Sequence, residues 1–397
     1  MTKDCKDPNC PDSGQSARSS GNEKEKSGNS NPVKTERLAS LDALRGFDMF
    51  WIVGGSSLAF ALSEYTGWPC LKWLSGQMHH AKWHGFTFWD LIFPLFLFLA
   101  GVAVPYSLSK MLEKGVPKRT IYWRIFRRLL LLIFLGAVYN GMLKFNGYDQ
   151  TRFASVLGYI GVAYFFAALI YLNCDIRHQA IWAMGILIGY WAAMKLVSIP
   201  LFESGDLSME GNMASYIDRH FLPGHLYRGI HDPQGLFINI PAISTALLGI
   251  LTGHWIKSVP LKKVWKATGM LAVGLICLGV AKLWNLSFPI NKELWTSSFV
   301  VYCAGWSLLL LGLFYLIIDV LGFKKWSFFF KIIGMNSITI YLGVQVVSFG
   351  HTRDYLFGGL LKVFDKPLQD VISAVFYILT WWIVLFFMCR KKIFLRV

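Results

Sequence analysis

Charged residues are scarce in this sequence, and the scarcity excludes most soluble folds. Only 16% of the 397 residues are Asp, Glu, Lys or Arg, whereas soluble domains carry about a quarter. The seven cysteines are scattered and form no disulfide framework, and Cys5 and Cys10 lack the second pair that a zinc site needs. We find no internal repeat, which disfavours an inverted-repeat transporter. The chain opens without an apolar segment, so we expect no cleavable signal peptide.

Apolar segments of membrane-spanning length are abundant instead. Hydrophobic residues make up 54% of the chain, and they recur in long runs from Leu41 to Met388. This pattern predicts an all-α polytopic membrane protein with about ten transmembrane helices within a transmembrane domain of residues 38–397. Residues 1–37 carry almost no apolar side chains and are predicted to form a disordered tail. The predicted spans are 42–63, 88–109, 125–143, 153–173, 180–198, 235–256, 266–284, 296–318, 332–349 and 368–389.

The net charge of +16 has a membrane explanation that does not require nucleic acid. Most of the 39 Lys and Arg residues fall in the tail and in alternate loops between the predicted spans. The positive-inside rule therefore places both termini and the tail in the cytoplasm. We expect a multi-pass protein of a bacterial inner membrane, in contact with the lipid bilayer and without a nucleic-acid partner.

Histidines gather at the predicted outer mouth of the second span, in the stretch MHHAKWHGFTFWDLIFP (78–94). Imidazole exchanges protons near neutral pH, so His79, His80 and His84 are candidates for acid–base chemistry. Asp90, just inside the apolar run, could orient one of these rings. Other interpretations remain open: solvated surface histidines, a zinc site using His80 and His84, and a purely interfacial anchoring role for Trp83.

Arginines mark the cytoplasmic ends of two predicted spans. Arg124, Arg127 and Arg128 share one helix face, which fits either membrane anchoring or a polyphosphate site. Arg45 lies three residues after Asp42, so the two side chains can pair on one face of the first span.

Two further polar stretches interrupt the apolar pattern. In HDPQG (231–235), Asp232 followed by a proline is typical of a helix start, with Asp232 as the N-cap of the sixth span. In GMNSITIYL (334–342), Asn336 and Ser337 fall inside the ninth span, where an amide usually faces a cavity or bonds to another helix.

Taken in order, several stretches resemble the heparan-α-glucosaminide N-acetyltransferase family of transmembrane acyltransferases. The resemblance covers about 42–389. The matching stretches are RLASLDALRG (37–46), HAKWHGFTFWDLIFPLFLFLAG (80–101), RFASVLGYIGVAYF (152–165), HDPQGLF (231–237) and GMNSITIYLGVQV (334–346).

The resemblance implies transfer of acetyl from cytoplasmic acetyl-CoA to the amino group of a terminal glucosamine across the membrane, as in a heparan sulfate-like glycan. It implies that His80 is the catalytic histidine and that Asp90 matches the aspartate of the same motif. Residues expected to contact the acceptor are His79, Trp83, His84, Ser56 and Asn336. Residues expected to hold acetyl-CoA are Arg45, Arg124, Arg127 and Arg128.

This sequence also departs from the family pattern. We expect this protein to lack the large luminal domain and the extra first span of the animal enzymes. Ser56 stands where those enzymes carry an Asn, and WHG replaces WNG.

The leading function is therefore acetyl-CoA-dependent N-acetylation of an amino sugar, without a metal. We favour direct transfer with His80 as general base over an acetyl-histidine intermediate. O-acetylation of an envelope glycan is the alternative within the same chemistry, and a transporter or scaffold is the alternative without chemistry. A homodimer remains open.

Overall fold

The computed structural model describes residues 38–394 except 145–146, 347–348 and 362. Every regular element in this part of the chain is a helix, and one isolated β-bridge joins Arg152 to Gly224. The all-α fold predicted from the sequence is therefore confirmed. The predicted tail, residues 1–37, lies outside the described residues.

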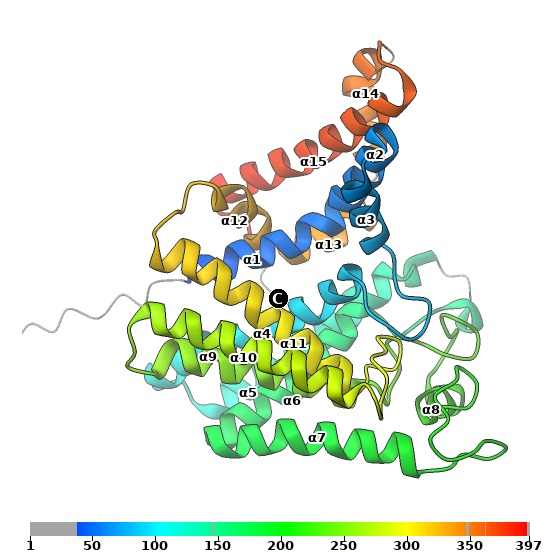
Figure 1. The fold of residues 1–397 in the computed structure, drawn as a ribbon. Helices are drawn as coiled ribbons and strands as arrows, with labels where there is room; N and C mark the ends of the chain where they lie inside the picture. Colours follow the sequence, from blue (N-terminus) through cyan, green and yellow to red (C-terminus); the bar gives the residue numbers. More distant parts are fainter. Residues whose placement is uncertain (1–37, 145–146, 347–348, 362, 395–397) are drawn as a thin grey trace, which may run out of the picture. The chain divides into compact units, whose positions relative to one another are not determined.

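The helices follow the chain with mostly short connections, and the order can be traced in Figure 1. Three single-turn elements (η1, η2 and η4) extend or follow α-helices, and a fourth (η3) stands in the loop before α6. The elements are α1 (Ala39–Phe50), η1 (Trp51–Gly55), α2 (Ser56–Thr66), α3 (Pro69–Gln77), α4 (Phe88–Glu113), α5 (Lys118–Tyr139), η2 (Met142–Lys144), η3 (Tyr148–Gln150), α6 (Val156–Asn173), α7 (Ile176–Leu196), α8 (Met213–Phe221), α9 (Asn239–Ser258), α10 (Lys263–Trp284), α11 (Ser297–Tyr315), η4 (Leu316–Val320), α12 (Ser327–Met335), α13 (Ser337–Val346), α14 (Phe349–Leu361) and α15 (Lys366–Arg390).

Six helical segments among the described residues are long and apolar enough to cross a membrane. A helix occupies each of the ten ranges predicted from the sequence, but the remaining segments are less apolar or interrupted. In the ninth range, α12 and α13 meet at an angle of 73° and together make at most a seventh candidate. The number ten and the orientation of the termini remain predictions. The six candidates are Ala39–Thr66, Phe88–Glu113, Val156–Asn173, Lys263–Trp284, Ser297–Val320 and Lys366–Arg390.

Helix α4 is the most enclosed of these candidate spans, because 72% of its most apolar 18-residue segment is buried. It crosses α9 where Gly101 and Gly249 face the partner backbone. A Cβ atom on either glycine would overlap a carbonyl oxygen of the other helix, at Ala246 or Phe98. Small residues allow this close approach, which fixes α4 against its neighbour and thereby fixes the residues at its first turn.

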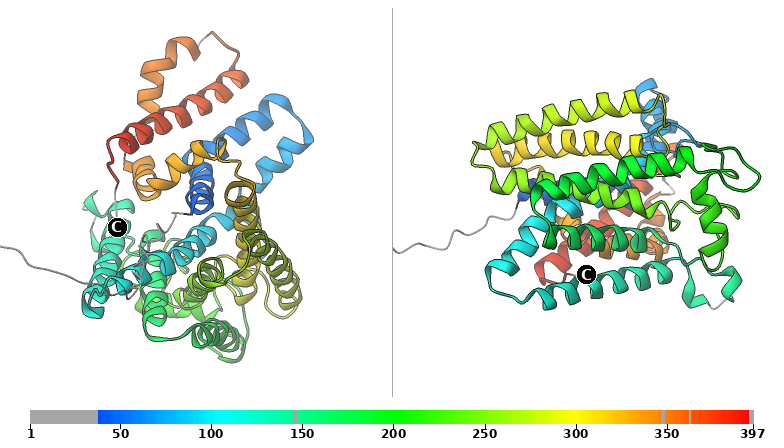
Figure 2. Two further views of the ribbon diagram at one scale, coloured as in Figure 1. Left: turned by 90° about the vertical axis from the view of Figure 1, so that its left-hand side faces the viewer. Right: turned by 90° about the horizontal axis from the view of Figure 1, so that it is seen from below.

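A second apolar cluster joins η1 to the C-terminal helices. Met49, Val53, Ile333, Ile340 and Trp381 are among its buried members. Figures 1 and 2 show α14 and α15 beside α2, on one side of α1, with α4–α11 on its other side. Helix α1 therefore separates two packing regions.

Candidate active site

A cavity of about 470 Å³ lies where α4 and α6 begin and α5 ends. Apolar side chains of the helices form much of its wall, and polar side chains from the loops converge on it. Enclosed apolar space with a few convergent polar groups is typical of a binding site. The polar lining residues are His80, Tyr139, Asn140, Arg152, Tyr227, Arg228, Gln234, Lys292, Glu293, Ser337 and Tyr341.

His80 and Asp90 form the closest acid–base pair at this cavity. The Nδ1 atom of His80 lies 2.7 Å from Asp90 Oδ1. The His80 side chain is 45% exposed, whereas that of Asp90 is 1% exposed. A carboxylate only accepts hydrogen bonds, so Nδ1 carries the proton and Nε2 is left as the basic nitrogen. The two sequence candidates are thus brought together at the cavity.

The start of α4 holds Asp90 in place. Asp90 Oδ2 accepts hydrogen bonds from the backbone N–H groups of Thr87, at 3.1 Å, and Ala81, at 3.3 Å. The Thr87 hydroxyl donates to the carbonyl oxygen of His79 at 2.6 Å. Thr87 and Asp90 form a capping box, a local pattern that orients the carboxylate at a helix N-terminus. The Asp90 side chain therefore both caps helix α4 and orients the His80 ring.

The segment 78–87 between α3 and α4 is called the histidine loop here. A second loop, between α10 and α11, lies against it. The Gly85 N–H donates to the Ile290 carbonyl at 2.8 Å, and Gly85 takes a left-handed φ of 120° that favours glycine. The same loop places Lys292 beside His80, with Nζ 3.2 Å from each ring nitrogen. Lys292 Nζ is also 4.0 Å from Asp90 Oδ1. Burial lowers the pKa of Lys292, although Asp90 and Glu293 oppose this effect.

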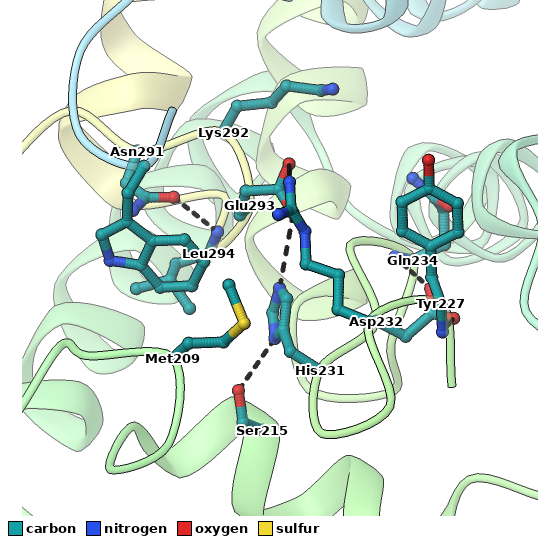
Figure 3. Close-up of polar contacts among 12 residues, drawn as sticks. Met209, Ser215, Tyr227, His231, Asp232, Gln234, Asn291, Lys292, Glu293 and Leu294 are labelled. Atoms are coloured by element: carbon teal, nitrogen blue, oxygen red, sulfur yellow. Dashed lines mark hydrogen bonds and ion pairs between the residues drawn. The ribbon is translucent and has the colours of Figure 1, made fainter. Parts of the chain in front are cut away.

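Lys292 and Glu293 are held by a loop that satisfies its own backbone. Asn291, buried, accepts a hydrogen bond from the Leu294 N–H at 2.9 Å, as Figure 3 shows. The hydroxyl of Thr296 accepts from the Asn291 N–H at 3.1 Å. These hydrogen bonds order the loop backbone in advance, so binding does not have to supply that conformational entropy. Lys292 and Glu293 are therefore held in fixed positions.

Arg152 and Asp232 form an ion pair in the cavity wall. Arg152 donates to both carboxylate oxygens of Asp232, at 2.7 and 2.6 Å, and to Gln234 Oε1 at 2.5 Å. Its guanidinium also lies over the Tyr227 ring, 4.6 Å from the ring centre. The predicted role of Asp232 as a helix N-cap is wrong. Helix α9 begins at Asn239, and the Asp232 carboxylate is engaged by Arg152 instead.

A buried histidine lies behind this wall. His231 lies between Ser215 and Glu293 in Figure 3, with Nδ1 2.8 Å from the Ser215 hydroxyl and Nε2 3.9 Å from Glu293 Oε2. Burial lowers the pKa of His231, while Glu293 opposes the effect. Arg228 Nε lies 3.2 Å from Glu293 Oε2 on the cavity side. Glu293 therefore joins the cavity to the long connection between α7 and α9 that carries α8.

The other predicted acceptor residues of this stretch lie around the cavity without lining it. His79 is exposed, and its ring contacts Phe60. His84 Nδ1 lies 3.3 Å from Asn291 Nδ2, and burial lowers its pKa. Trp83 donates to the Leu207 carbonyl at 2.9 Å and packs edge-on against His231. Trp83 thus secures the connection between α7 and α9.

The zinc interpretation placed His80 and His84 four residues apart, but residues 80–87 are not helical, so the two rings do not share a helix face. Among the described residues, no group of three or more His, Cys, Asp or Glu could hold a metal ion.

Ser56 and Asn336 both occur at irregular points in helices. The Ser56 hydroxyl donates to the Trp51 carbonyl at 3.1 Å, across the π-helical turn η1. Asn336 stands at the break between α12 and α13, buried, and neither of its amide atoms has a hydrogen-bond partner among the described residues. Its neighbour Ser337 lines the cavity, but neither Ser56 nor Asn336 is among the lining residues.

The predicted acetyl-CoA arginines are not gathered around this cavity, and none of the four is among its described lining residues. Arg45 lies 3.9 Å from Asp42, which confirms that predicted pair. Arg124 Nη1 lies 3.1 Å from Met111 Sδ, and Arg128 lies over the Tyr164 ring at 4.0 Å. Arg127 is exposed.

Sequence reasoning missed several lining residues, above all Lys292, Glu293, Arg228 and Arg152. Two adjacent charges in NKELW (291–295), between two apolar spans, were a usable signal. Their destination was not visible, because Lys292 stands 212 residues from His80 in the chain.

Comparisons with known proteins agree with the sequence motifs. A family model described as a domain of unknown function (DUF5009) matches residues 37–194. The chain is 27% identical over 415 residues to a Homo sapiens protein named heparan-alpha-glucosaminide N-acetyltransferase. It is 26% identical over 417 residues to the Mus musculus protein of the same name. Both matches cover 91% of this chain, which spans 60% and 61% of the length of these curated relatives.

The family resemblance predicted from the sequence is therefore confirmed: over 91% of its length the chain is similar to proteins named heparan-alpha-glucosaminide N-acetyltransferase.

Proposed function

We propose that this chain is a membrane acetyltransferase that moves acetyl from cytoplasmic acetyl-CoA to the amino group of a glucosamine-type sugar on the periplasmic side of a bacterial inner membrane. The observation that carries the proposal is the 2.7 Å contact between His80 and buried Asp90 at the edge of the cavity. The names of the relatives support transfer of an acetyl group to nitrogen.

The proposed orientation puts the cavity at the outer end of ten spans, with both termini in the cytoplasm. Its support is the distribution of Lys and Arg, which cluster between α4 and α5, between α9 and α10, and after α15. Arg124 contacts Met111 near the far end of α4, about 30 Å from Asp90 at the helical rise of 1.5 Å per residue. Donor phosphates and acceptor sugar are therefore assigned to opposite ends of the same helix.

Acetyl-CoA is a substrate in this proposal, and Arg45, Arg124, Arg127 and Arg128 are the residues assigned to its phosphates. Arg127 is exposed. Arg128 Nε is buried and has no hydrogen-bond partner among the described residues, so it retains a donor for an anion. Guanidinium groups suit phosphate because their N–H donors match its oxygens.

His80 acts in this proposal as the general base. The Nδ1–H group is held by Asp90, so Nε2 accepts a proton from the acceptor's ammonium group and makes the nitrogen nucleophilic. That first proton leaves to solvent. The amine nitrogen then attacks the thioester carbonyl and gives a second proton to Nε2, the C–S bond breaks, and this second proton passes to the departing thiolate. Asp90 fixes the tautomer and orientation of the ring, as the aspartate of a catalytic triad does.

The acceptor is assigned to the wall opposite the histidine loop. Tyr227 is exposed and is held by Arg152, so it offers an aromatic face to a sugar ring. Glu293 and Gln234 supply acceptors for ammonium and hydroxyl donors. Tyr227 replaces Trp83 as the proposed platform, because Trp83 is engaged with the connection between α7 and α9.

Release of free CoA from acetyl-CoA by the purified protein tests the proposal, with acetylated product identified by mass spectrometry. Acceptors with a terminal glucosamine should stimulate release, and matched N-acetylglucosamine compounds should not. Stimulation only by hydroxyl acceptors would replace N-acetylation with O-acetylation. No release with any acceptor would contradict an acetyltransferase.

Initial rates with both substrates varied test direct transfer. Intersecting double-reciprocal lines are expected, because a ternary complex precedes chemistry. Parallel lines, with radiolabelled acetyl retained on the protein without acceptor, would establish an acetyl-histidine intermediate instead.

A further inference from the structure

Lys292 occupies an unusual position relative to His80. Its Nζ atom is 3.2 Å from both Nδ1 and Nε2 of the ring. The two ring nitrogens flank a single carbon, so an atom at this equal distance in the ring plane would overlap ring carbons. The ammonium group therefore lies over the face of the imidazole ring.

This placement leaves the in-plane lone pair of Nε2 free. Nδ1 is engaged by Asp90 in the ring plane, and Trp89 lies near the ring at a centroid distance of 6.2 Å. A lysine that merely hydrogen-bonded to Nε2 would compete with the acceptor for that nitrogen. Lys292 instead acts on the ring through its charge.

From this arrangement, and resting on the proposed function, we propose that Lys292 is a positioning residue that limits the positive charge of His80 during acetyl transfer. The Lys292 ammonium disfavours a long-lived positive charge on the His80 ring, whereas the Asp90 carboxylate allows a transient one. The proton taken by Nε2 from the acceptor nitrogen is therefore passed on to the CoA sulfur when the C–S electron pair leaves. The acceptor's ammonium group gives up two protons in all: one leaves to solvent as the amine forms, and the other moves through Nε2 to the sulfur as the amide forms.

Two carboxylates face the Lys292 ammonium and favour its charge, against the larger opposing effect of burial. Asp90 lies 4.0 Å away, and Glu293 is its neighbour in the chain. Both favour the charged form, while burial and Arg228 lower the pKa of Lys292. The Lys292 side chain is only 14% exposed, so solvent screens its charge weakly.

Lys292→Met removes the charge and keeps much of the side-chain volume. We expect kcat to fall about tenfold, with the acidic limb of the pH–rate profile moving up by about one pH unit, because a like charge at this distance shifts ionisation by about that much. The KM for acetyl-CoA should change less than twofold. Lys292→Arg, which keeps the charge, should retain the wild-type limb.

Lys282→Met is the matched control, since Lys282 also lies over an aromatic ring, 5.2 Å from the centre of Tyr302, but does not line the cavity. Lys282→Met should leave kcat and the acidic limb of the pH–rate profile unchanged. A folded Lys292→Met protein with the wild-type limb and a kcat within twofold of wild type would overturn the proposal. If that variant does not fold, Lys292→Gln provides the same comparison.

A second measurement does not depend on turnover. Diethyl pyrocarbonate acylates neutral imidazole, so the pH dependence of His80 labelling, read by mass spectrometry, reports the charge of the ring. In Lys292→Met the labelling should require higher pH than in wild type, and His79 labelling should not change. Absence of any transfer by wild-type protein would refute the proposed function, whereas unchanged His80 labelling would refute the role of Lys292.

Discussion

The two ends of α4 differ in how their charged side chains are arranged. At the first turn, His80, Asp90 and Lys292 come within 4.0 Å of one another and share a cavity. At the far end, Arg124 and Arg128 contact Met111 and Tyr164 respectively, without a shared carboxylate. Charges that are fixed and partly buried do chemistry, whereas exposed ones bind anions or anchor a helix in the membrane. The comparison supports the proposal that catalysis takes place at one end and donor binding at the other.

The largest expected effect follows from replacing His80. His80→Ala should reduce turnover by about 10²–10⁴-fold, because positioned acid–base catalysis contributes about that much. His79→Ala is the control, since His79 is exposed and contacts Phe60. Steady-state CoA release measures both. A folded His80→Ala protein that keeps more than a tenth of wild-type turnover would remove His80 from the mechanism.

Asp90→Asn tests whether the ring needs a carboxylate. We expect kcat to fall by at least about tenfold, because an amide can hold the imidazole in the wrong tautomer. Thr87→Val separates capping from catalysis, since it removes the hydroxyl but leaves the backbone N–H that Asp90 accepts. The thermal unfolding temperature in detergent should be lower in both variants than in wild type. Equal losses of kcat in the two would show that Asp90 serves only the helix.

The local part of this site was predictable, and the distant part was not. Asp90 follows His80 by ten residues, and the capping box that joins Thr87 to Asp90 is a short-range pattern. Lys292 comes from a loop whose position depends on the packing of α10 and α11. A sequence pattern cannot show which loops meet after the helices pack.

The same limit applies to the fold, where the predicted cap at Asp232 was wrong. Asp232 has the neighbours of a helix cap, but Arg152, 80 residues away, takes its carboxylate, and α9 starts later. The span predicted over 332–349 stays a prediction, and it contains a bend at Asn336 that hydropathy does not register. The helix positions follow from composition, whereas breaks and ion pairs follow from tertiary contacts.

Replacing Glu293 tests the proposed acceptor site at the first-turn end of α4. Glu293→Gln should raise the acceptor KM about tenfold, since a hydrogen bond to a charged group is worth about 1.5 kcal/mol. The KM for acetyl-CoA should not change, because the phosphates are assigned to the other end of α4. Glu210→Gln, at an exposed position of the connection between α7 and α9, is the control. Equal changes in both KM values would mean that Glu293 supports the cavity as a whole.

The smallest effect is expected near the far end of α4, where Arg124 and Arg127 of α5 are exposed and a single contact is screened by solvent. Replacing Arg124, Arg127 and Arg128 singly by Gln should raise the KM for acetyl-CoA a few-fold at one position or more. The acceptor KM should stay nearly constant. Arg119→Gln is the matched control, because Arg119 is exposed on α5, like Arg124 and Arg127, and is not assigned to the phosphates. Arg128 is the best candidate, since its buried Nε still lacks a partner among the described residues. Normal acetyl-CoA kinetics in all three variants would reduce this cluster to a membrane-topology signal and leave the donor phosphates to other residues.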